Sequence, residues 1–291
     1  MTAKDTNRAN RPSEGSFWPV DLHAHTTASD GTLAPDELVD FAVQRGVEIL
    51  GVTDHDTVDG IEAASRRASE RRVTLMPGVE LSTTERGSEV HVLGYGVDLR
   101  DASLRKRLAD LAASRVRRIS AMIEKLCEAG YAIDGDAVLA QADEGSIGRP
   151  HVARALIEIG VVASVDEAFD RFLKPGRPGW VPREPFTPEQ AVQLLRDHGV
   201  LPVLAHPLST RDVPGVLRRL IPVGLRGMEV WYGEYDPGER EALRRTAEEH
   251  NLLATGGSDY HGPRFRAGRE LGSVPVPREV FDRLVDAGVR V

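Results

Sequence analysis

Short apolar runs rich in Val, Ile and Leu recur along this chain and predict β-strands. Continuous apolar runs, unlike runs that alternate with polar residues, are typical of strands that are buried on both faces of a sheet. We therefore predict seven buried strands, over residues 17–22, 48–53, 73–79, 89–95, 200–205, 227–231 and 252–256.

Helical patterns lie between most of these runs. Pro35 opens one pattern and Gly46 closes it, as expected for the first helical position and for the residue after a helix. Similar patterns cover residues 58–72, 188–198 and 237–250. Strands and helices in alternation imply parallel pairing, and seven such strands favour an α/β fold of the TIM-like (βα)7 barrel type. A doubly wound open sheet is the alternative, because spacing along the chain does not show closure.

The segment between about residues 96 and 199 is too long to be one connection. Its helical patterns cover residues 103–130, 135–143, 150–160 and 164–173, and a stretch rich in Pro and Gly follows them. We predict that residues 100–185 form a helical insertion, a lid that returns over the mouth of the barrel. The barrel domain then consists of residues 17–99 and 186–291.

The composition, 41% hydrophobic and 28% charged over 291 residues, is that of an ordinary globular protein. No apolar run approaches the roughly 20 residues that span a bilayer. Residues 1–16 lack the apolar segment of a secretory signal, and we interpret them as a disordered tail. A single cysteine fits a reducing compartment, and the net charge of −8 argues against a general nucleic-acid coat. We expect a cytoplasmic protein with no membrane association and no obligate protein partner.

Histidine and carboxylate side chains collect at the predicted strands. His23 and His25 are two apart, a spacing that points both side chains to the same face of a strand, and Asp30 follows a short Thr/Ser loop. The later motifs TDHDT, GVEL, EVHVLGYG, LAHP and GGSDYHG complete the candidate set, which is His23, His25, Asp30, His55, Glu80, His91, His206, Asp259 and His261. In a (βα) barrel the carboxyl ends of the strands form the active-site face, so these motifs converge on one mouth.

Each motif also has a purely structural interpretation. Asp54, Asp56 and Thr57 could cap the helix that follows them, and His206 could be a hydrogen-bonded core histidine. Repetition at one strand after another favours a metal site over a series of such coincidences.

Nine candidate ligands are too many for one ion, because a zinc-like ion binds about four ligands and catalytic sites leave one of these positions open. With one bridging carboxylate they suit three divalent ions. Mixed imidazole and carboxylate ligation favours Mn, Fe or Zn over Ca or Mg, with Mn as our first expectation. Such a site is suited to a phosphate, and a metal-bound hydroxide held by these ligands is the expected nucleophile. The candidate general acids are His206 and His261.

Taken together, HAHTTASDG, TDHDT, GVE, AHP and GSDYHG resemble the successive motifs of the PHP (polymerase and histidinol phosphatase) superfamily. The resemblance covers both barrel segments and implies the PHP fold, a distorted seven-stranded barrel with a trinuclear phosphoesterase site. It assigns His23, His25, Glu80 and Asp259 to one ion, Glu80, His91 and His206 to a second, and Asp30, His55 and His261 to the third. No ligand is missing, which argues against a non-catalytic member.

The GRPH motif of the insertion indicates which branch of the superfamily the chain resembles. Pro150 suits the first position of a helix, which places Arg149 and His151 beside the positive end of that helix, a suitable site for an anion. A capped surface helix with a solvated arginine is the simpler interpretation. The motif resembles the branch whose members remove the 3′-phosphate from nucleoside 3′,5′-bisphosphates, with related members that trim RNA from the 5′ end. The resemblance implies that Arg149 and His151 bind the second phosphate of a small nucleotide or of a short RNA.

Two other functions stay open. One is hydrolysis of histidinol phosphate, against which the GRPH-bearing insertion counts, and the other is a non-enzymatic, polymerase-associated metal-binding module, against which the complete ligand set counts. Arg115, Arg117 and Arg118 on the long predicted helix either extend a basic face toward a polynucleotide or form a solvated helix face. Glu229 belongs to the sixth predicted strand and has no assigned role.

Overall fold

The computed structural model describes residues 17–85, 88–140, 146–210, 212–263, 265–266 and 268–291. Within them, seven strands form one sheet in the order in which they occur along the chain. They are β1 (Val20–Asp21), β2 (Ile49–Val52), β3 (Thr74–Glu85), β4 (Ser88–Tyr95), β5 (Leu201–Leu204), β6 (Gly227–Tyr232) and β7 (Leu253–Gly257). Each overlaps a predicted run, and β3 extends to Glu85, beyond the predicted end at residue 79. The tail predicted over residues 1–16 lies outside the described residues.

The prediction that all strands pair in parallel is wrong for β4. β1, β2 and β3 pair in parallel, as do β5, β6 and β7, but β4 is antiparallel to both β3 and β5. β3 continues past Glu80 to Glu85, and β4 begins at Ser88, so no helical crossover fits between them. A parallel connection needs about a dozen residues or more, and a hairpin is the result.

The sheet curves until its two edge strands meet. Main-chain bonds join the edges, with Leu22 N–H donating to Gly256 O at 3.2 Å and His25 N–H donating to Tyr260 O at 2.8 Å. Ala24 and Tyr260 form an isolated parallel bridge just beyond the ends of β1 and β7. The predicted seven-stranded α/β barrel is therefore confirmed as a nearly closed barrel of mixed strand direction.

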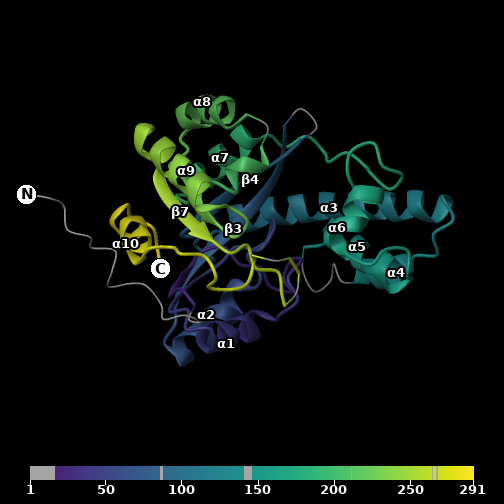
Figure 1. Cartoon of the computed structure of the whole chain (residues 1–291), viewed down its shortest axis with the longest axis horizontal. Helices are drawn as coiled ribbons and strands as arrows, with labels where there is room; N and C mark the ends of the chain where they lie inside the picture. Colours follow the sequence, from purple (N-terminus) through teal and green to yellow (C-terminus); the bar gives the residue numbers. More distant parts are fainter. Residues whose placement is uncertain (1–16, 86–87, 141–145, 211, 264, 267) are drawn as a thin grey trace, which may run out of the picture.

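Helices surround this barrel on its outer side (Figure 1). The predicted helices are present as α1 (Pro35–Gln44), α2 (Ile61–Arg71), α7 (Pro188–Asp197) and α9 (Pro237–Glu249), and the structure adds α8 (Val213–Val223) and α10 (Arg278–Asp286). Their buried apolar faces pack on the strands, with Leu38, Ile61 and Leu195 at or near zero exposure. No helix in the described ranges is long and apolar enough to cross a bilayer.

The helices of the lid project to one side of the barrel, on the right in Figure 1. They are α3 (Ala102–Glu128), α4 (Gly135–Ala140), α5 (Arg149–Glu158), α6 (Val165–Ala168) and a π-helical turn, η3 (Phe169–Leu173). A second apolar cluster, which includes Met122, Leu156 and Phe172, lies among these helices and is separate from the clusters of the barrel. The lid is therefore stabilised largely by its own core.

Candidate metal centre

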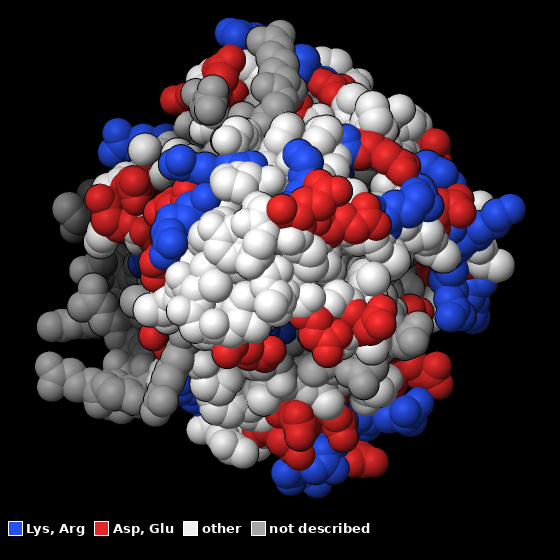
Figure 2. Space-filling view, turned by 90° about the vertical axis from the view of Figure 1, so that its right-hand side faces the viewer, with Lys and Arg blue, Asp and Glu red and all other residues white. Residues whose placement is uncertain are grey.

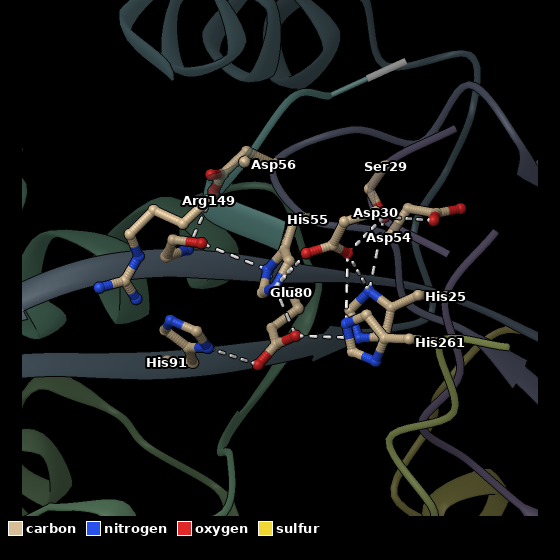
Figure 3. Close-up of polar contacts among 12 residues, drawn as sticks. His25, Ser29, Asp30, Asp54, His55, Asp56, Glu80, His91, Arg149 and His261 are labelled. Atoms are coloured by element: carbon tan, nitrogen blue, oxygen red, sulfur yellow. Dashed lines mark hydrogen bonds and ion pairs between the residues drawn. The ribbon is translucent and has the colours of Figure 1, made fainter. Parts of the chain in front are cut away.

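Glu80 lies at the middle of the predicted ligands, which we call the ligand cluster (Figure 3). Its Oε2 is 3.2 Å from His23 Nε2, 3.1 Å from His25 Nε2 and 3.3 Å from His55 Nδ1. Its Oε1 is 2.8 Å from His91 Nδ1 and 3.0 Å from His206 Nε2. One carboxylate that is 1% exposed thus faces five imidazoles, an arrangement that suits a carboxylate bridging two ions.

The strands explain how these side chains meet. His23 and His25 follow β1 with the bridge residue Ala24 between them, so both rings lie on the same side, 5.2 Å apart between centroids. His55, three residues beyond the end of β2, forms an isolated parallel bridge with Glu80 of β3. Because β4 runs in the reverse direction, His91 in its first half lies at the edge where the parallel strands end.

Two further carboxylates complete the ligand cluster. Asp30 Oδ1 is 3.2 Å from His261 Nε2, and Asp30 Oδ2 is 3.8 Å from His55 Nε2. Asp259 Oδ1 is 3.1 Å from His25 Nε2 and 3.3 Å from His23 Nε2. The structure therefore brings all nine predicted residues together from distant parts of the chain.

Several donor atoms in the ligand cluster form no well-directed hydrogen bond to another described residue, which leaves them available to a metal ion. Nε2 of His25, Nε2 of His91 and Oδ1 of Asp259 are buried and have no hydrogen-bond partner among the described residues. Buried polar atoms are otherwise nearly always paired. The residues present fit divalent ions, since an ion would satisfy these lone pairs.

The donor atoms fall into three overlapping groups, in each of which they lie within 4.8 Å of one another. The groups are His23, His25, Glu80 and Asp259; His25, Asp30, His55 and His261; and His55, Glu80 and His91. The first group is the same as the set that the resemblance assigns to one ion. The second group contains Asp30, His55 and His261, the set that the resemblance assigns to the third ion, together with His25. The third has His55 where the resemblance places His206, although His206 also contacts Glu80. These buried groups are consistent with more than one metal ion.

The carboxylates of the ligand cluster are ionised. Burial acts to raise the pKa of Glu80, but the surrounding histidines, with His55 and His23 foremost, hold it well below its usual value. The pKa of Asp30 is likewise held well below its usual value, because His261 and His55 outweigh the effect of burial. Burial acts to lower the pKa of His25, yet Asp259 and Glu80 raise it to about 10. Anionic ligands in a buried site attract cations strongly.

Polar residues around the ligand cluster hold its members in place. Glu229, which had no assigned role, is fully buried, and its Oε1 lies 2.9 Å from His23 Nδ1. Its Oε2 accepts the main-chain N–H of His206 at 2.6 Å. On Asp259, Oδ2 accepts from the Tyr232 hydroxyl at 2.9 Å, which leaves Oδ1 toward the histidines.

The proposed capping role for the TDHDT motif is not what the structure shows. Asp54 accepts hydrogen bonds from the Thr26 main-chain N–H and hydroxyl, each at 2.7 Å, and from the Ser29 hydroxyl at 2.6 Å, and so orders the loop that carries Asp30. Asp56 accepts from Arg115 Nε at 2.6 Å. The following helix α2 begins only at Ile61 and has no side-chain cap.

A cavity of about 440 Å³ opens over the ligand cluster. Barrel residues line one part of it, including His55, Glu80, His91, His206 and His261, and lid residues line another, including Arg149, Val165 and Phe169. Arg149 pairs with Glu89 on β4, and its guanidinium lies over the Phe169 ring, 4.8 Å from the centroid. The lid therefore forms a wall of the mouth, and Arg149 lies on the His91 side of the cluster (Figure 3).

The other predicted substrate residue, His151, is not among the residues that line this cavity. It is buried, and its Nδ1 lies 3.1 Å from Gly148 N, where it accepts the main-chain N–H. Burial, reinforced by Arg154, lowers the pKa of His151 to about 4, so the ring is neutral near pH 7. In this structure His151 fixes the first turn of α5, from which Arg149 extends.

Arg115, Arg117 and Arg118 of α3 do not form a free basic face. Arg115 and Arg118 are buried and bonded, and Arg117 is exposed but pairs with Glu184 at 2.8 Å. Figure 2, which shows the side of the molecule at the far end of the lid, has a broad uncharged area with acidic and basic side chains interspersed around it. The solvated-face interpretation holds for Arg117, and neither interpretation holds for Arg115 and Arg118.

A nearly closed seven-stranded barrel with a buried histidine and carboxylate cluster defines the class of protein, and comparisons with known proteins define the family. The PHP domain family matches residues 21–147. The 5′-3′ exoribonuclease Rnm of Salmonella typhimurium is 36% identical over 249 residues, which cover 84% of this chain and 85% of that protein. The chain belongs to the PHP domain family and is a phosphoesterase of that family, as its motifs predicted.

Other relatives match over nearly the whole chain. The 3′,5′-nucleoside bisphosphate phosphatase of Chromobacterium violaceum is 32% identical over 274 residues, which cover 91% of this chain and 96% of that protein. A solved structure from Bifidobacterium adolescentis, assigned to the metal-dependent phosphoesterases, has a TM-score of 0.85 and 31% identity, covering 93% of this chain and 96% of that one. An amidohydrolase structure from Chromobacterium violaceum, with bound sulfate and no metal, has a TM-score of 0.83 and 31% identity, covering 92% of this chain and 96% of that one.

Proposed function

We propose that this protein removes the 3′-phosphate from nucleoside 3′,5′-bisphosphates. The observation that carries the proposal is a single cavity that is lined both by the ligand cluster and by Arg149. One phosphate can lie against the cluster while a second phosphate meets Arg149. The names of two relatives, a nucleoside bisphosphate phosphatase and a 5′-3′ exoribonuclease, support nucleotides as the substrate class. Trimming of 5′-phosphorylated RNA from its 5′ end is the same chemistry on a longer substrate, and we propose it as a second activity.

We propose that the ligand cluster holds three divalent ions, with Mn²⁺ as the first expectation. His23, His25, Glu80 and Asp259 would hold one ion, Glu80, His91 and His206 a second, and Asp30, His55 and His261 the third. When bound, such ions neutralise charge on the phosphate that is cleaved and lower the pKa of water, which supplies a nucleophile at neutral pH.

The side chains around the cluster position the substrate and the ligands. Arg149 binds the phosphate that is not cleaved, and His151 supports it from within α5. His206 Nε2 faces Glu80 while its Nδ1 lies 2.9 Å from the Ser209 hydroxyl. His261 Nε2 faces Asp30 while its Nδ1 lies 2.8 Å from the main-chain oxygen of Asp259. Because both ring nitrogens are engaged in each case, these contacts favour ligand roles over a general-acid role.

The proposal is tested by phosphate release in the presence of Mn²⁺ from adenosine 3′,5′-bisphosphate, 5′-AMP and histidinol phosphate, with a 5′-phosphorylated RNA oligomer followed by gel. We expect a strong preference for the bisphosphate, with stepwise shortening of the RNA from its 5′ end. Preference for histidinol phosphate would overturn the substrate assignment. Absence of hydrolysis of all four with Mn²⁺, Fe²⁺ or Zn²⁺ would likewise overturn the substrate assignment.

Arg149→Gln tests the two-phosphate geometry. A hydrogen bond to a charged group contributes about 1.5–3 kcal/mol, so kcat/KM for the bisphosphate is expected to fall roughly 10- to 150-fold. Hydrolysis of p-nitrophenyl phosphate, which has no second phosphate, is expected to fall far less. Arg171→Gln, an exposed lid arginine paired with Glu167, is the matched control. Equal losses on the two substrates would remove Arg149 from this role.

A further inference from the structure

Arg183 is a largely buried guanidinium on the wall of the cavity. It lies in the segment that returns from the lid to the barrel, its side chain is 12% exposed, and it lines the same cavity as the ligand cluster and Arg149. Its partners among the described residues are two carboxylates beyond hydrogen-bond distance, Asp56 at 3.6 Å and Glu89 at 3.8 Å. Its Nε is buried and has no hydrogen-bond partner among the residues that the structure describes. Buried N–H groups are almost always bonded, so this group is suited to donate to an acceptor on a bound ligand.

The neighbours of Arg183 carry a surplus of positive charge. Four guanidinium groups and two carboxylates lie close together here, so their net charge is +2. The arginines are Arg115, Arg118, Arg149 and Arg183, and the carboxylates are Asp56 and Glu89. Burial, with the nearby Arg115, lowers the pKa of Arg183 to about 10, which still leaves it charged near pH 7. Burial acts to raise the pKa of Glu89, but Arg149 and Arg183 hold it below its usual value.

Two of the four arginines have their donors committed within the protein. Arg115 donates to Asp56, to the Ser82 hydroxyl at 2.7 Å and to the main-chain oxygen of Ile147 at 3.0 Å. Arg118 donates to the main-chain oxygen of Val181 at 2.9 Å and to Glu89 at 3.3 Å.

Arg149 and Arg183 differ from this committed pair. Arg149 donates through one nitrogen to Glu89 and otherwise lies over Phe169, and both arginines line the cavity. Donors remain for a bound anion on these two side chains.

We propose that Arg183 and Arg149 together bind a terminal phosphate monoester, the phosphate of the substrate that is not hydrolysed. This inference rests on the proposed function and adds Arg183 as a specificity-determining residue. A phosphate monoester carries about −1.5 to −2 near pH 7, which matches the surplus of two positive charges. An internal phosphodiester carries a single charge and leaves half of the surplus unbalanced. The pair therefore selects a bisphosphate or a 5′-phosphorylated end over the interior of a polynucleotide.

The test uses Arg183→Gln and Arg183→Lys with two substrates that differ only by the 5′-phosphate, adenosine 3′,5′-bisphosphate and adenosine 3′-monophosphate. For Arg183→Gln we expect kcat/KM for the bisphosphate to fall roughly 10- to 150-fold. This loss should be at least tenfold larger than the loss of kcat/KM for the monophosphate. Arg183→Lys is expected to recover part of the loss, because lysine keeps the charge but not the planar fork of donors. Arg177→Gln, an exposed arginine of the same segment, is the matched control.

A binding measurement makes the test independent of hydrolysis. Isothermal titration with adenosine 5′-monophosphate, without added metal, should show weaker binding to Arg183→Gln than to the wild type, with adenosine as the reference ligand. Equal losses on both substrates with unchanged binding would overturn the role of Arg183 and leave the proposed function standing. Binding that depends on Arg183 in a protein that hydrolyses neither substrate would overturn the function and keep the phosphate site. Wild-type protein that binds the monophosphate no better than adenosine would overturn the inference.

Discussion

Glu229 connects two ligands that come from distant parts of the chain. Its carboxylate lies against Nδ1 of His23 and accepts the main-chain N–H of His206, whose φ of 25° is unusual for a residue other than glycine. A hydrogen bond at Nδ1 places the proton there and leaves the Nε2 lone pair toward Glu80 and Asp259. The second bond supports the strained backbone of His206. One buried residue thus orients ligands of two of the proposed ions.

Glu229→Gln is expected to weaken Mn²⁺ binding about 10- to 100-fold, the usual effect of losing a residue that orients a metal ligand. Glutamine keeps the size but cannot accept both hydrogen bonds. Titration calorimetry on the metal-free protein measures the affinity, and thermal unfolding in EDTA shows whether the fold itself is altered. Glu48→Gln, an exposed residue paired with Arg278, is the control. An unchanged affinity would refute this role.

At the scale of elements, the backbones of β7 and β1 pack closely where the two strands meet. A Cβ added to Gly257 would lie 2.3 Å from the main-chain nitrogen of His23 and 2.5 Å from its Cβ. Real side chains do not approach this closely, so glycine is required for the edge strands to meet. Closure of the barrel and the position of the first ligand therefore depend on the same contact.

Gly257→Ala should lower the free energy of unfolding by about 1–3 kcal/mol, the usual cost of overpacking a core, and should also weaken Mn²⁺ binding because His23 is displaced. Urea denaturation followed by circular dichroism measures the first effect. In Gly238→Ala the new Cβ would meet only the Asp236 side chain, at 3.2 Å, and we expect a much smaller change. Equal stability of Gly257→Ala and the wild type would contradict the close-packing argument.

At the scale of the whole molecule, the ligand cluster joins the two ends of the barrel. Its members span His23 to His261, and the lid is inserted between them in the chain. An ion bound by such residues stabilises only the folded chain, since the unfolded chain cannot assemble the site. Metal binding should therefore be linked to global stability.

Addition of Mn²⁺ to EDTA-treated protein is expected to raise the melting temperature by several degrees, because ligand at 100 times its Kd contributes about 2.7 kcal/mol. Differential scanning calorimetry over a series of metal concentrations measures the shift. Asp30→Asn should reduce the shift, since it removes a charge that faces His261 and His55. A melting temperature that does not respond to Mn²⁺, Fe²⁺ or Zn²⁺ would contradict the metal assignment.

The sequence by itself determined the strands, the helices α1, α2, α7 and α9, and the nine candidate ligands. Strand and helix follow from local patterns of apolar residues, and ligands at strand ends converge in any closed barrel. The family followed for the same reason, since its motifs are short and contiguous. The seven strands and these four helices, predicted from local patterns, were confirmed by the fold, and the family was confirmed by the comparisons.

Only the tertiary structure decided features that depend on residues far apart in the chain. The reversal of β4 followed from a hairpin too short for a crossover, although the run itself was predicted. Arg115 and Arg118 of α3 became buried partners of barrel carboxylates, and Arg183 came to line the cavity, because the lid folds back onto β4. A charged residue in a sequence has no fixed partner, and its role is set by the groups that desolvate it and pair with it once the chain has folded.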